Sequence, residues 1–213
     1  VTPARAPVPE DRVKRAQNLK ASAYFLDVTL AGTCRIKAAD WLAGAHPQHA
    51  HAFVFLIEFG REPKAGEAGE AWIRGTNAAR TDLRCAEVAV VMAGYIRALG
   101  WSARGHVVAD TRVSIERLAQ RAGLAMAADG VLKAPFLKRG FRLGVVTTDY
   151  EFAPDAPLGS LEGLGAHQLG QDLQSQWLGH GQQLHGPFLV VRQAGEPALE
   201  TPRTHDPVVV DDA

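Results

Sequence analysis

The sequence has little cysteine. Cys34 and Cys85 are the only two among its 213 residues. Two thiols are too few for a four-cysteine iron–sulfur cluster or an all-cysteine zinc site, and they do not make the framework of a small disulfide-stabilised domain. We therefore expect two small, buried hydrophobic residues, no metal site and no iron–sulfur cluster on this chain.

Long apolar runs and an excess of one charge are also lacking. The longest apolar run, residues 86–96, is far shorter than the ~20 residues that cross a bilayer. The 23 basic and 23 acidic side chains cancel, which argues against a general nucleic-acid binder, since such proteins carry a basic excess. We expect no membrane span, no nucleic-acid partner and a cytoplasmic location, while a removed export signal stays open because the chain begins with Val1.

What is present is the pattern of a layered globular domain. Apolar periodicity predicts helices over residues 10–26, over residues 76–99 and from Ser114 to Gly123. Apolar and β-branched runs predict strands, at residues 27–36, 51–59, 101–108, 141–148 and 188–191. The run at residues 51–59 is apolar almost throughout, which predicts burial on both faces of a sheet. Alternating helices and strands indicate an α+β or α/β layered domain.

The two ends of the chain differ from this middle part. Residues 1–9 hold three prolines and little periodicity, so we expect an extended arm. After Pro157 the chain becomes rich in glycine and glutamine, and it ends in a proline-bearing acidic stretch. We expect residues 159–213 to form an irregular extension that contacts a partner protein, because such a composition cannot build a core alone.

Four pieces of the sequence carry a family resemblance in a shared order. The most specific are Leu118-Ala-Gln-Arg-Ala-Gly-Leu124 and Arg142-Leu-Gly-Val-Val-Thr-Thr-Asp149, and residues 15–35 and 86–104 are the other two. Together they resemble the corrinoid-binding core of reductive dehalogenases and of their relatives, the epoxyqueuosine reductases. The resemblance covers roughly residues 10–158 and implies a nitroreductase-like layered α+β core there.

The same resemblance implies a cobalamin site. Its cofactor-binding residues would be Gly123, Leu124, Ala125, Gly130, Arg142, Leu143, Gly144, Thr147 and Thr148. Glycines permit a close approach of backbone to ligand, threonine hydroxyls form hydrogen bonds, and an arginine can bind phosphate. The alternative for the two glycines at 123 and 130 is a helix stop and a turn without any ligand.

Several positions depart from the family pattern. Ala125 stands where the family usually has a glycine, and the cysteine-rich iron–sulfur segment that follows the strand in the family is absent. Asn77 occupies the place of the aspartate that donates a proton in the epoxyqueuosine branch, and an amide cannot act as that acid. We therefore name no catalytic residue.

Three histidines stand close together, at His46, His49 and His51. Two or three imidazoles can bind a transition metal. No acidic or thiol ligand is near in sequence, and a loop that leads into a strand favours exposed histidines instead.

Three functions remain open from the sequence. The first is the corrinoid-binding component of a reductive dehalogenase-like oxidoreductase, a subunit that receives electrons from an iron–sulfur partner chain in a hetero-oligomeric complex. The second is a non-catalytic scaffold subunit that has lost the cofactor. The third is a flavin-binding protein, because the nitroreductase-like fold commonly carries flavin.

Overall fold

The computed structural model describes residues 5–128 and 130–159. At its centre is an antiparallel sheet of four strands in the order β1-β2-β6-β3. These are β1 (Leu30–Arg35), β2 (His51–Glu58), β6 (Phe141–Thr148) and β3 (Ala103–His106). Strand β2 lies between β1 and β6, with Ala31 opposite Phe55 and Phe55 opposite Gly144.

The two central strands are buried on both faces, as the apolar run at residues 51–59 predicts. Successive side chains of a strand point to opposite faces. Phe53 and Phe55 accordingly join one apolar core, and Val54 and Leu56 join a second. Residues of β6 alternate in the same way, with Val146 in the first core and Val145 in the second.

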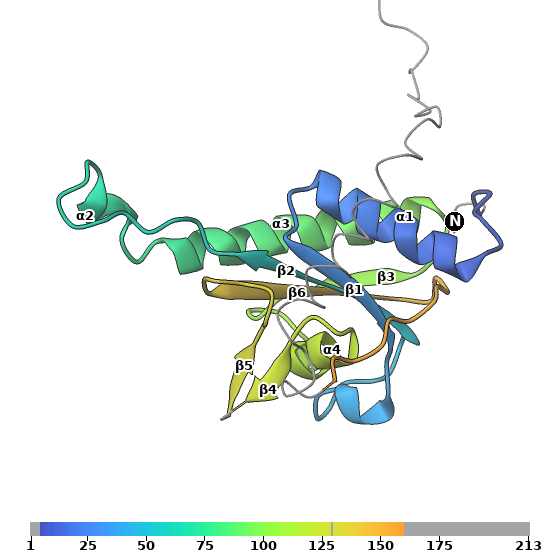
Figure 1. Cartoon of the computed structure of the whole chain (residues 1–213). Coiled ribbons are helices and arrows are strands. Elements are labelled where there is room, and N and C mark those ends of the chain that lie inside the picture. The colour runs from blue at the N-terminus through green and yellow to red at the C-terminus, as the bar shows by residue number, and fades with distance from the viewer. Residues whose placement is uncertain (1–4, 129, 160–213) are drawn as a thin grey trace, which may run out of the picture. The chain divides into compact units, whose positions relative to one another are not determined.

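Two helices cover the first face of the sheet, α1 (Arg12–Phe25) and α3 (Asn77–Ala98) (Figure 1). Asp11 caps α1, since its carboxylate accepts a hydrogen bond from the Val13 amide at 2.7 Å. Helix α3 places Cys85, Met92 and Ile96 against the sheet, each almost fully buried.

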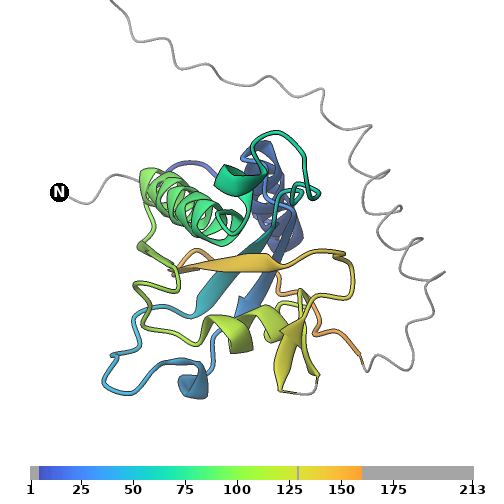
Figure 2. The ribbon, with the colours of Figure 1, turned by 90° about the vertical axis from the view of Figure 1, so that its left-hand side faces the viewer.

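The second face is covered by α4 (Ile115–Arg121) and by the small hairpin of β4 (Met126–Ala128) and β5 (Val131–Lys133), as Figures 1 and 2 show from two sides. The short 3-10 helix η1 (Ala38–Asp40) is joined to α4 by an ion pair between the buried Asp40 carboxylate and the partly exposed Arg121. The Asp40 carboxylate accepts two hydrogen bonds from Arg121: Nε donates to Oδ2 at 3.1 Å, and a terminal guanidinium nitrogen donates to Oδ1 at 2.9 Å.

After β6 the chain runs back along the edge strand β1. The Asp155 carboxylate accepts hydrogen bonds from the amide of Thr33 at 2.8 Å and from the ammonium of Lys20 at 2.7 Å. The Asp155 amide in turn donates to the carbonyl of Thr33. The segment after β6 is therefore held to β1 and α1 as far as Asp155.

The observed mixture of helices and sheet confirms the α+β class. The nitroreductase-like naming stays a prediction, and the predicted strand at 188–191 lies outside the described residues. Both cysteines are buried as expected, and burial raises the pKa of Cys34 and of Cys85 to about 12. In the part of the chain that the structure describes, no helix has the length and apolar character needed to cross a membrane.

Candidate functional site

The nine predicted cofactor residues lie in three places. Gly123, Leu124 and Ala125 follow α4, and Gly130 lies in the turn between β4 and β5. The other five belong to β6, where alternation divides them between the two faces of the sheet. Leu143 belongs to the core on the α4 side, so Thr147 shares that side, whereas Arg142, Gly144 and Thr148 have the opposite parity and share the α3 side.

The turn after α4 is filled by protein atoms. Gly123 has a φ of 70°, a conformation that favours glycine, and a Cβ there would clash with the carbonyl oxygen of Ala156. Leu124 and Ala125 are buried in the second core. Gly130 also has a positive φ, 73°, but nothing lies within 4 Å of its Cβ position. The two glycines thus fulfil the helix-stop and turn roles.

Gly144 lies beneath an aromatic ring. It is opposite Phe55 in the register of β2 and β6, and a Cβ at Gly144 would stand 2.7 Å from Cε2 and 2.9 Å from Cε1 of that ring. Phe55 itself is fully buried. The space that a glycine could leave for a cofactor is therefore occupied by Phe55.

We expect Gly144→Ala to lower the free energy of unfolding by about 1–3 kcal/mol, because the added methyl overpacks the core against Phe55. Chemical denaturation measures the change. Phe55→Leu in the same chain should recover part of the loss. Equal stability of Gly144→Ala and the parent would contradict this packing.

Arg142 is engaged within the protein. Its Nε lies 2.8 Å from the Asp82 carboxylate of α3, and its guanidinium lies 5.1 Å from the ring centroid of Phe59. Its side chain is 35% exposed. A phosphate would have to compete with Asp82 for this cation.

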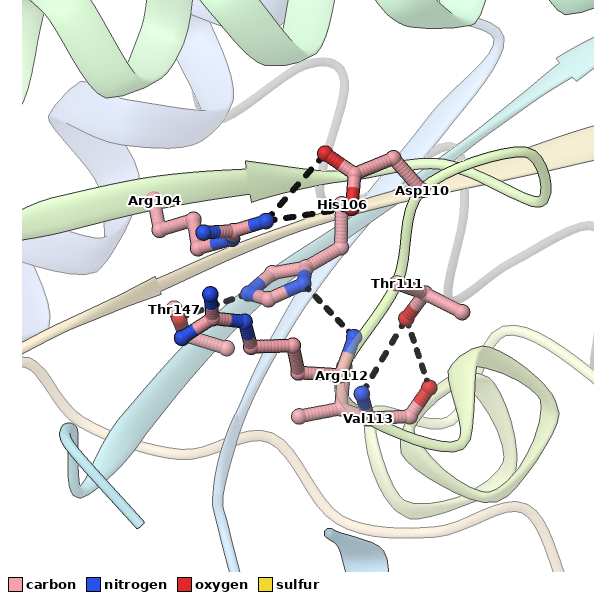
Figure 3. A network of polar contacts seen from close by, with 7 residues as sticks. All are labelled: Arg104, His106, Asp110, Thr111, Arg112, Val113 and Thr147. Atoms are coloured by element: carbon pink, nitrogen blue, oxygen red, sulfur yellow. Dashed lines mark hydrogen bonds and ion pairs between the residues drawn. The ribbon is translucent and has the colours of Figure 1, made fainter. Parts of the chain in front are cut away.

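Thr147 is the centre of a buried polar network that joins both histidine-bearing segments. His49 Nδ1 lies 2.8 Å and His106 Nε2 lies 2.9 Å from the Thr147 hydroxyl. His49 Nε2 lies 2.8 Å from the hydroxyl of Ser102. Figure 3 shows His106 between Thr147 and the backbone of Arg112, whose amide donates to His106 Nδ1 at 3.3 Å.

These partners fix where the protons lie. Because His106 Nδ1 accepts from an amide, the neutral ring carries its proton on Nε2 and donates to Thr147. The Thr147 hydroxyl then donates to His49 Nδ1, and His49 Nε2 donates to Ser102. Burial lowers the pKa of His106 from 6.5 to about 4, assisted by nearby Arg104, and burial also lowers the pKa of His49.

The expectation that the histidines of residues 46–51 are exposed is wrong for two of them. His49 and His51 are 9% and 6% exposed, and His51 packs edge-on against Phe152. The residues that bury them, such as Thr147 and Phe152, are distant in the sequence. The local sequence around the histidines therefore does not predict their burial. Among the described residues, no group of three or more His, Cys, Asp or Glu side chains is arranged to hold a metal ion.

Solved structures resemble this fold closely. The catabolic reductive dehalogenase NpRdhA is 58% identical over 75% of this chain, with a TM-score of 0.71. A reductive dehalogenase described with a mechanism for B12-dependent dehalogenation is 51% identical over 83% of this chain, with a TM-score of 0.73. This chain is homologous to part of the reductive dehalogenases.

The homologous part is about a quarter of a dehalogenase, since the chain spans 23% and 27% of the two proteins. An epoxyqueuosine reductase bound to a tRNA stem loop is 14% identical over 74% of this chain and 51% of its own, with a TM-score of 0.53, which shows the fold alone. No protein-family model and no curated protein sequence matches the chain.

The described part of this dehalogenase homologue does not fit a corrinoid at the nine predicted residues. They are divided among the turn after α4, the turn between β4 and β5 and both faces of β6, and protein atoms fill the Cβ positions of Gly123 and Gly144. Two surface hollows, one at residues 66–74 and one between residues 42–46 and 111–112, are lined by other residues. The cofactor role of the nine residues therefore stays a prediction.

Proposed function

We propose that the protein to which this chain belongs is a corrinoid-dependent oxidoreductase of the reductive dehalogenase type. The observation that carries this proposal is the 58% identity to a catabolic reductive dehalogenase over three quarters of the chain. The same relative has been solved in complex with 3-bromo-4-hydroxybenzoic acid. We therefore expect organohalides as the substrate class, aromatic halides among them.

Reductive dehalogenation replaces a carbon–halogen bond by a carbon–hydrogen bond, and it consumes two electrons and one proton while halide leaves. An iron–sulfur centre is a suitable source of such electrons. With two cysteines in this sequence, a complete centre would have to lie on chain outside these residues. Delivery by a separate partner chain remains part of the proposal.

Two roles are open for the described domain within such a protein. It could hold the corrinoid at the nine residues, or it could be a scaffold that does not hold it. The packing supports the scaffold role. A single ligand cannot contact Arg142 and Gly144 on one face of the sheet and Leu143 and Thr147 on the other without entering the core, and the Thr147 hydroxyl already has histidine partners.

Cobalamin titration of the purified chain tests this assignment of roles. We expect no saturable change in the corrinoid absorption spectrum and no cobalt retained after gel filtration. Binding of one equivalent would restore the first role. In that case Arg142→Met and Gly123→Val should weaken binding, whereas Arg139→Met, a change at a half-exposed arginine paired with Glu58, should not.

The chemistry is tested separately on the complete protein with any co-purifying partner. We expect bound cobalt and halide release from an aromatic organohalide in the presence of a strong reductant. Neither result depends on which part of the protein holds the corrinoid. A complete protein without cobalt and without halide release would refute the proposed function.

A further inference from the structure

We draw no further inference here: the strongest candidate, the exposed apolar face of helix α3 that carries Leu83 and Val90, supports no proposal because nothing in the part of the chain that the structure describes shows what covers it.

Discussion

Replacing Arg121 by methionine is expected to lower the free energy of unfolding by about 3–5 kcal/mol, one of the two largest effects that the structure predicts. The Asp40 carboxylate is fully buried and accepts two hydrogen bonds from the Arg121 guanidinium. Methionine keeps much of the side-chain volume but removes the charge. The carboxylate then stays in the interior without its cation, although the Lys37 amide still donates to it at 2.7 Å. An uncompensated buried charge is costly.

Two further variants make this prediction specific. The double variant Asp40→Asn, Arg121→Met should regain a large part of the loss, since it removes the buried charge together with its partner. Arg117→Met is the matched control, because Arg117 lies on the same helix, is exposed and donates to a backbone carbonyl of Ala39. Its cost should stay below about 1 kcal/mol. If urea denaturation shows equal losses for the single and the double variant, the ion pair is not the cause.

The sequence predicted best those elements in which burial imposes a long, regular pattern. Strand β6 spans Phe141–Thr148, as predicted, and α3 differs from the prediction by one residue at each end. The elements pack closely where they meet, as at Gly32 of β1, where a Cβ would stand 2.5 Å from the carbonyl oxygen of Ala122. In these elements many residues face the same two cores, so each reinforces the pattern.

Short elements with few buried residues escaped prediction. Strands β4 and β5 have three residues each, and Val131 is 59% exposed. They pair as a hairpin across the turn that contains Gly130, and Leu132 of β5 packs against the second core. Helix α2 (Glu70–Ile73) has no buried residue at all. An apolar periodic pattern cannot predict elements that contact the core through few residues or none.

The site residues were harder to predict because a pattern gives backbone conformation but not neighbours. Gly123 and Gly130 both have positive φ, yet one lies against Ala156 and the other has open space. Thr147 and Thr148 are adjacent, so their side chains serve opposite faces, and Thr148 donates to the Ser102 carbonyl at 2.6 Å. Such partners are distant in sequence and become known only with the fold.

Homology to only part of the dehalogenases explains why the sequence predicted the family but not the place of this chain within it. Family pieces in the right order correctly identify the family, but they do not tell which part of a much longer protein they represent. The chain spans about a quarter of its dehalogenase relatives. A turn and a strand that resemble the family can have packing roles in such a part, so the resemblance by itself does not locate the cofactor.

The second large effect is a loss of stability in mild acid. The pKa of His106 falls from 6.5 to about 4 on folding. Between these values the unfolded chain binds more protons than the folded one, so stability is full above about pH 6.5 and is lost as the pH falls toward 4. At ~1.4 kcal/mol per pKa unit, His106 alone accounts for about 3 kcal/mol. The lowered pKa values of His49 and His51 act in the same direction.

The hydrogen-bond network gives the structural reason for this acid sensitivity. A proton added to His106 Nδ1 points at the Arg112 amide, so a donor faces a donor and the bond is lost. Arg104 and Arg112 repel the new charge, and Asp110 offsets this only in part because its carboxylate already pairs with Arg104. Denaturation curves at several pH values should show the loss in the parent and in the control His46→Gln, an exposed histidine. In His106→Gln the slope between pH 6.5 and 4 should flatten, and an unchanged slope would assign the acid sensitivity to other groups.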